Sequence, residues 1–142
     1  MTTNLKDILI EKVNKSVWWH VTPYDRGAYK KRGKFLSSTY KQAEFYGRPC
    51  DIPEKVSISN PLYGTSEMEI LQVLFPKEYN GLCATFEHDY EDWYERRIEL
   101  DSKMYQQAKR MGFDAIVLLD SNGKKYLITN KKPHSIELNL CK

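Results

Sequence analysis

The segment 33–47 places the tightest limit on how this chain can fold, because it changes from strand-like to helix-like within a few residues. Its first residue is a glycine, which lets the backbone bend, and residues 35–38 can run extended. Thr39 can cap a short helix that carries Ala43 and Tyr46 on one face. Such a junction offers hydroxyls, aromatic rings and a helix N-terminus to an anionic, ring-bearing ligand such as a nucleotide. An ordinary strand–turn–helix without a ligand is the alternative.

The length and composition of the chain are those of a globular protein. Its 142 residues suit one compact domain, covering residues 1–142. No apolar run approaches the roughly 18 residues that a membrane helix needs, and no basic region followed by an apolar core marks a secretion signal. The three cysteines are far apart and lack metal-type spacing. We therefore expect a cytoplasmic protein with reduced thiols, no metal site and no membrane partner.

Charged residues are unevenly distributed along the chain. The formal net charge of +3 is too small to indicate nucleic-acid binding by itself. Basic residues gather in the segment 26–34, and acidic residues gather in the segment 87–99. The basic segment could meet a phosphate or an acidic partner surface, and a solvated polar loop is the alternative.

Apolar periods elsewhere in the chain predict further helices and strands. Helical periods occur over 4–14, 66–75 and 87–111. Strand-like patterns occur over 16–21, 55–59, 114–120, 125–129 and 135–140. Gly112 is the expected stop of the last helix, the segment 24–34 reads as a loop, and the segment 77–86 reads as irregular. This order of elements predicts an α+β fold with mostly antiparallel sheets rather than a doubly wound parallel sheet.

A histidine and a threonine stand at the end of the first predicted strand. Strand alternation sends Trp18 and His20 to one face and Trp19 to the other, and Pro23 ends the strand. His20 and Thr22 would then lie on one face, where both could form hydrogen bonds with the edge of a ribose. A structural histidine with its hydrogen bonds satisfied inside the protein is the alternative.

Short motifs follow one another along most of the chain. In order they are His20–Thr22, Gly33–Ser38, Val56–Leu62, Gly112–Val117 and Lys125–Ile128. In this order and spacing, from about Trp18 to Leu138, the chain resembles the ADP-ribosyltransferase superfamily. It looks closest to the small bacterial and phage branch, which includes phage anti-CRISPR ADP-ribosyltransferases. No Gly-rich phosphate motif or nucleophile elbow competes with this resemblance.

The resemblance implies a fold and a cofactor site. The family fold is two packed, mostly antiparallel sheets with peripheral helices, and NAD+ binds in the cleft between the sheets. By resemblance, His20 would bind the adenosine-side ribose with support from Thr22. The second motif would lie beside the nicotinamide ribose, and Tyr46 would stack on the nicotinamide ring. The residues implied in cofactor binding are therefore His20, Thr22, Phe35, Ser37, Ser38 and Tyr46.

Two positions depart from the His-Tyr-Glu pattern of the family. The family tyrosine is replaced here by Phe35 or Leu36, which have no hydroxyl. The family glutamate is replaced by Lys125, which cannot accept a hydrogen bond from the ribose 2′-hydroxyl. A lysine also cannot stabilise the positive charge that develops on the ribose as nicotinamide leaves.

A carboxylate elsewhere in the chain would have to replace the missing glutamate. Asp120 is the nearest candidate, at the far side of the same predicted hairpin, and we assign it as the catalytic residue by resemblance. A turn-forming aspartate ahead of Ser-Asn-Gly is the alternative for this position. Glu137 and Glu99 are the next candidates.

The resulting hypothesis is an enzyme, a mono-ADP-ribosyltransferase that uses NAD+ to modify a macromolecule of a host. A phage-encoded factor acting on a host protein, such as part of a defence complex, would fit this branch, and a toxin would use the same chemistry. A nucleic-acid acceptor is left open. The first alternative is a catalytically degenerate module that binds NAD, ADP-ribose or a protein. The second is an RNA 2′-phosphotransferase-like enzyme, for which Arg26, Arg32 and Arg48 would bind the phosphate.

Overall fold

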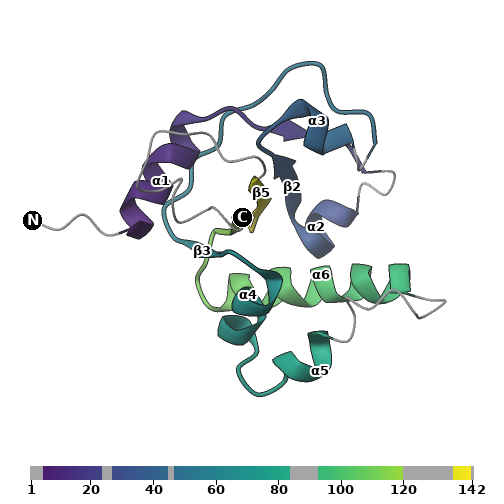
Figure 1. The fold of residues 1–142 in the computed structure, drawn as a ribbon. Coiled ribbons are helices and arrows are strands. Elements are labelled where there is room, and N and C mark those ends of the chain that lie inside the picture. Colours follow the sequence, from purple (N-terminus) through teal and green to yellow (C-terminus); the bar gives the residue numbers. More distant parts are fainter. Residues whose placement is uncertain (1–4, 24–26, 45–46, 84–92, 120–135, 142) are drawn as a thin grey trace, which may run out of the picture.

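A five-stranded mixed sheet with helices on both faces makes up the computed structural model, and the fold is α+β (Figure 1). The structure describes residues 5–23, 27–44, 47–83, 93–119 and 136–141. The helices are α1 (Leu5–Lys15), α2 (Ala28–Arg32), α3 (Tyr40–Ala43), α4 (Glu67–Leu74), α5 (Tyr79–Cys83) and α6 (Trp93–Arg110). The strands are β1 (Trp19–His20), β2 (Lys34–Ser37), β3 (Pro61–Gly64), β4 (Ala115–Leu119) and β5 (Ile136–Leu140).

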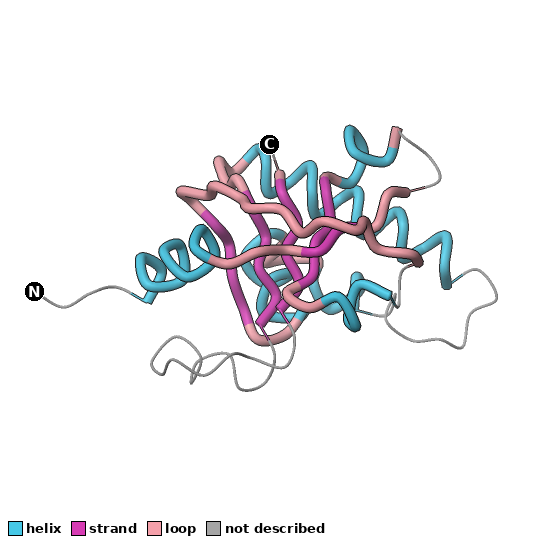
Figure 2. Tube along the Cα trace, turned by 90° about the horizontal axis from the view of Figure 1, so that it is seen from above, coloured by secondary structure: helices cyan, strands magenta, loops and turns pink. Residues whose placement is uncertain are grey.

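The strands lie side by side in the order β1-β2-β5-β4-β3 (Figure 2). Three of the four neighbouring pairs are antiparallel, and β3 with β4 is the parallel pair. The C-terminal strand β5 therefore lies in the middle of the sheet, between β2 and β4. Because β2 and β5 are about a hundred positions apart in sequence, their pairing joins the two ends of the chain.

Each face of the sheet is covered by its own apolar cluster. On one face, Leu9 and Val13 of α1 pack with Val117 and Leu138 of the central strands. On the other face, α4 and α6 pack against β3 and β4; the buried residues there include Leu62, Ile70, Leu71, Leu100, Tyr105, Ala108 and Ile116. Strand alternation assigns each residue of β5 to one of the two faces. Glu137 and Asn139 consequently lie on the face that α6 covers.

Several elements expected from the sequence are confirmed. The side chain of Thr39 accepts a hydrogen bond from the backbone N–H of Gln42 and caps α3. Ser66 caps α4 in the same way, by accepting from Glu69 N–H. Gly112 ends α6 with a φ of 88°, in the left-handed region that favours glycine.

Three local expectations were wrong because tertiary contacts stabilise the segments differently. The segment 55–59 is not a strand, and strand β3 begins instead at Pro61. Proline is tolerated there because β3 is an edge strand and has a free side for the missing N–H. The basic segment expected to be a loop contains helix α2, which packs on α6. The segment 77–86 expected to be irregular contains α5.

The expectation of two packed sheets is not met in the described residues, which form a single sheet. The predicted strand 125–129 and its turn lie outside the described residues, as does the segment 87–92 that precedes α6. The described residues establish an α+β fold with a mostly antiparallel sheet.

Candidate functional site

Strands β1, β2 and β5 are neighbours in the sheet and bring the first two motifs together. His20 on β1 pairs with Leu36 on β2, and Ser37 on β2 pairs with Glu137 on β5. Cross-strand partners place their side chains on the same face of a sheet. Ser37 and Glu137 therefore lie next to each other, in a row that continues through Leu118 to Gly64.

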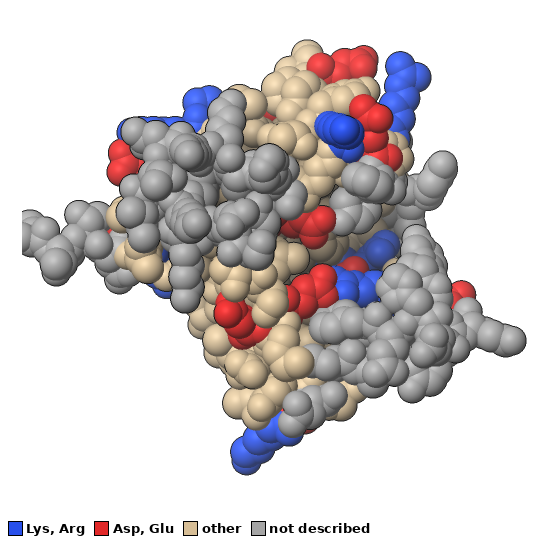
Figure 3. All heavy atoms as spheres, in the orientation of Figure 1, with Lys and Arg blue, Asp and Glu red and all other residues tan. Residues whose placement is uncertain are grey.

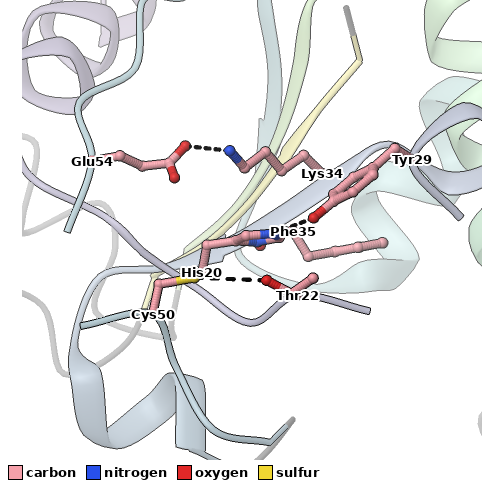
Figure 4. A network of polar contacts seen from close by, with 7 residues as sticks. All are labelled: His20, Thr22, Tyr29, Lys34, Phe35, Cys50 and Glu54. Carbon is pink, nitrogen blue, oxygen red and sulfur yellow. Dashed lines mark hydrogen bonds and ion pairs between the residues drawn. The ribbon is translucent and has the colours of Figure 1, made fainter. Parts of the chain in front are cut away.

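His20 is buried, and both of its ring nitrogens are hydrogen-bonded within the protein (Figure 4). Nδ1 lies 2.8 Å from the carbonyl oxygen of Phe35, and Nε2 lies 2.8 Å from the hydroxyl of Tyr29. Because a carbonyl only accepts, Nδ1 carries the proton and donates it; in the neutral ring, Nε2 then accepts from the Tyr29 hydroxyl. A ribose hydroxyl can reach Nε2 only by taking the place of Tyr29.

A pocket of about 80 Å³ lies beside His20. Its lining consists of His20, Val21, Pro23, Ala28, Tyr29, Arg32, Gly33 and Phe35. Whole pockets for drug-sized ligands measure about 300–1,000 Å³, so this one has room for no more than a single group of such a ligand. Phe35 is 45% exposed, and its ring would contact a ligand that extends out of the pocket.

Thr22 is not among the described residues that line this pocket. Its hydroxyl oxygen is 3.8 Å from the sulfur of Cys50 (Figure 4). The chain from Cys50 to Glu54 runs beside β1: Cys50 N–H donates to His20 O, and Trp18 and Glu54 form a bridge. The hydroxyl of Thr22 therefore contacts this neighbouring segment.

Ser37 and Ser38 lie at the other end of β2, near Glu137. Ser37 is buried. The hydroxyl of Ser38 accepts from Ile136 N–H at 3.0 Å and donates to Gln42 Oε1 at 3.4 Å. Gln42 Nε2 in turn donates to Glu137 Oε1 at 3.5 Å. Gln42 therefore links the second motif to a half-buried carboxylate on the central strand.

Arg97 of α6 supplies positive charge near Glu137. Its guanidinium forms two hydrogen bonds with the carboxylate of Glu67 and lies 3.2 Å from Asp101. Burial by itself would lower the pKa of Arg97. The hydrogen bonds with Glu67 and the negative charges of Asp101, Glu67 and Glu137 outweigh burial, so the pKa is raised. On the face drawn in Figure 3, acidic and basic atoms lie side by side near the middle.

Asp101 makes the stability of this cluster depend on pH. Burial raises the pKa of its carboxyl from 3.8 to about 6, against the opposing charge of Arg97. Because the folded-state pKa lies above the ordinary value, the carboxyl of Asp101 takes up a proton on folding when the pH lies between 3.8 and about 6. The contribution of this group to stability is complete below pH 3.8 and is lost as the pH rises through about 6.

We expect Asp101→Asn, which resembles the protonated form, to gain stability relative to the native protein as the pH rises from 4.5 to 7.5. The relative gain should be on the order of 2–3 kcal/mol, since one pKa unit corresponds to about 1.4 kcal/mol. Urea unfolding at several pH values measures this difference. The exposed Glu95→Gln serves as the control, and a difference for Asp101→Asn that does not change with pH would contradict the assignment.

The other residues that the sequence singled out as candidates fall partly outside the described part of the chain. Tyr46, Asp120, Lys125 and Arg26 lie outside the described residues. Glu99 is exposed on α6. Of the arginines expected to gather around a phosphate, Arg32 lines the pocket and Arg48 is exposed, so the described part of the chain holds one of them at the site.

Sequence reasoning missed Tyr29, the hydrogen-bond partner of His20. The segment around it was interpreted as a loop, and no local pattern reports that a five-residue helix will place its hydroxyl against a strand. Gln42 was also missed, although its position as the third residue after the capping Thr39 put it in the first turn of an expected helix.

Among the described residues, no helix is both long and apolar enough to span a bilayer. No protein-family model, curated protein or solved structure matches this chain.

Proposed function

We propose that this protein is a mono-ADP-ribosyltransferase that takes ADP-ribose from NAD+ and transfers it to a host macromolecule, in the first instance a protein. One observation carries the proposal. Strands β1, β2 and β5 are adjacent: Ser37 on β2 pairs with Glu137 on β5, and His20 on β1 pairs with Leu36, the residue that precedes Ser37. The resemblance of the motifs to ADP-ribosyltransferases had implied His20 and Ser37, and Glu137 supplies the carboxylate that the chemistry needs.

Glu137 suits a reaction that develops positive charge. In the transfer, the bond between nicotinamide and the ribose C1′ breaks, and nicotinamide leaves as a neutral molecule with the bonding electrons. The acceptor forms the new bond to C1′ and loses a proton. A carboxylate beside the ribose stabilises the positive charge at the transition state. Gln42 donates a hydrogen bond to one oxygen of Glu137, and Arg97 interacts with Glu137 electrostatically.

The pocket beside His20 would hold the other end of NAD+. In this proposal a ribose hydroxyl takes the place of the Tyr29 hydroxyl at His20 Nε2, and Phe35 lies against the ligand where it leaves the pocket. Ser37 follows Phe35 by two positions on the same face of β2, about 7 Å further along the strand. NAD+ would thus extend along β2 from His20 toward Glu137.

A test of the His20 contact uses two variants. We expect His20→Ala to weaken the binding of NAD+ by on the order of 1 kcal/mol or more, because a ribose hydrogen bond is lost. Tyr29→Phe is the matched control: it removes the competing hydroxyl and keeps the His20 ring, so affinity for NAD+ should be retained. Calorimetric titration measures both, and urea unfolding of each variant separates binding from stability. An unchanged affinity in His20→Ala would rule out this contact.

A degenerate binding module is the second candidate, and one observation favours it. The ring nitrogens of His20 are already satisfied by Phe35 O and Tyr29, as expected of a structural histidine. Such a module would bind NAD+ or ADP-ribose, or a protein partner, without turnover.

Transfer of label from NAD+ distinguishes the two candidates. The purified protein is incubated with NAD+ labelled in the adenylate phosphate, together with lysate of a host cell. Label that becomes attached to a macromolecule supports the transferase, and treatment with protease or nuclease identifies the acceptor class. Binding of NAD+ without attachment of label in any lysate would favour the binding module.

A further inference from the structure

The pocket beside His20 has a positive charge in the described part of its lining. Among the described residues that line it, Arg32 is the charged one and none is a carboxylate. The next cation along the chain, Lys34, is already paired with Glu54 at 2.6 Å (Figure 4). Of the described residues, Arg32 is therefore the one whose charge a ligand in this pocket would meet.

Contacts between α2 and α6 fix Arg32 at the pocket. The last carbonyls of α2 are held by side chains of α6: Ser102 donates to Lys31 O at 3.0 Å, and Gln106 donates to Lys30 O at 3.5 Å. Arg32 is half-buried at the end of this short helix. It therefore reaches the pocket from an anchored backbone rather than from a free loop.

Asp101, the acid that interacts electrostatically with Arg32, forms its ion pair with another arginine. Asp101 interacts with Arg32 electrostatically, but its carboxylate lies 3.2 Å from Arg97, which acts on it more strongly. Among the described residues, Arg32 forms no ion pair within 4.0 Å. An arginine that is fixed, half-buried and without a close acid favours an anionic ligand, since guanidinium groups match phosphate oxygens well.

We propose that this pocket binds a phosphate group of the ligand, with Arg32 as the residue that holds it. The identity of the ligand rests on the proposed function: it would be the diphosphate of NAD+ or ADP-ribose. The pocket of about 80 Å³ has room for one such group. A phosphate here would be adjacent to a ribose bound at His20, because His20 and Arg32 line the same pocket.

Calorimetric titration of the full chain tests the inference with ligands that differ in phosphate. The ligands are ADP-ribose, NAD+, inorganic pyrophosphate and nicotinamide riboside, which carries no phosphate. The variants are Arg32→Gln and, as a control of equal charge change on the same helix, the exposed Lys31→Gln. Thermal unfolding without ligand verifies that each variant is folded.

We expect Arg32→Gln to weaken binding of ADP-ribose, NAD+ and pyrophosphate by about 10- to 100-fold. Binding of nicotinamide riboside should stay within about twofold, and Lys31→Gln should change every affinity by less than about twofold. The effect of Arg32 should also become smaller at high salt.

Results that differ from these expectations would overturn the phosphate site, the proposed function or both. Equal binding of ADP-ribose by Arg32→Gln and the native protein would overturn the phosphate site and leave the proposed function standing. Equal losses in Lys31→Gln would likewise overturn a local site. Binding of pyrophosphate through Arg32, without binding of NAD+ or ADP-ribose, would retain the phosphate site and overturn the proposed function. Absence of binding by every ligand would overturn both.

Discussion

Glu137→Gln is expected to reduce the release of nicotinamide from NAD+ by at least about 100-fold, the cost of removing an electrostatic group aimed at a transition state. Glutamine keeps the size of the side chain and can still contact Gln42, so the fold and the affinity for NAD+ should be retained. The loss should therefore appear in kcat rather than in KM, because the negative charge acts only as the ribose becomes positive.

Two further variants make this result specific to Glu137. Glu95→Gln removes an exposed carboxylate from α6 and should leave nicotinamide release unchanged. Asp120→Asn tests the carboxylate that the sequence had suggested first. Full activity in Glu137→Gln together with loss of activity in Asp120→Asn would move the catalytic role to Asp120 and refute our assignment.

Gly33→Ala is expected to lower the free energy of unfolding by about 3 kcal/mol or more. The φ of Gly33 is 76°, a conformation that costs an L-residue about 1–3 kcal/mol. A methyl group at this position would also overlap the carbonyl oxygen of Leu140 and the side-chain oxygen of Asn139. Since Leu140 O belongs to the backbone of the central strand, it cannot move aside cheaply, and overpacking of this kind adds about 1–3 kcal/mol.

Two other glycines separate strain from overlap. Gly112 has a φ of 88° but open space around it, so Gly112→Ala should cost only the backbone term, on the order of 1 kcal/mol. Gly81 lies in α5 with open space and no positive φ, and Gly81→Ala should be neutral or slightly stabilising. Urea unfolding gives the three values, and an equal cost at positions 33 and 112 would show that overlap contributes nothing.

Caps, apolar periods and turn glycines in the sequence predicted the elements whose structure depends on residues close together in the chain. Helix α4 has a capping serine and an apolar period over its length, and α6 ends at a glycine that must adopt a positive φ. Strand β5 alternates between its two faces as its sequence predicts. For these elements, the residues that fix the structure are close together in the chain.

Elements that depend on distant contacts were not predictable in this way. Helix α2 has only five residues and is held by Ser102 and Gln106, some seventy positions later. A helix this short is marginal by itself. Strand β3 begins at a proline, which is acceptable only because its place in the sheet is at the edge.

The candidate site was predictable in part. Local patterns singled out His20 and the second motif, Gly33–Ser38, because both contain types of side chain that commonly bind ligands in proteins. They could not place Glu137 opposite Ser37, since that position depends on the register of two strands a hundred residues apart. Nor could they show that Tyr29 already occupies the ring nitrogen of His20 that a ribose would use.

The most direct test of the central claim is a crystal structure of Glu137→Gln with NAD+, in which the slowed reaction preserves the intact cofactor. We predict the nicotinamide ribose between Ser37 and the side chain at position 137, and the diphosphate at Arg32 in the pocket beside His20. NAD+ bound on another part of the molecule, with these strands uncovered, would contradict the account.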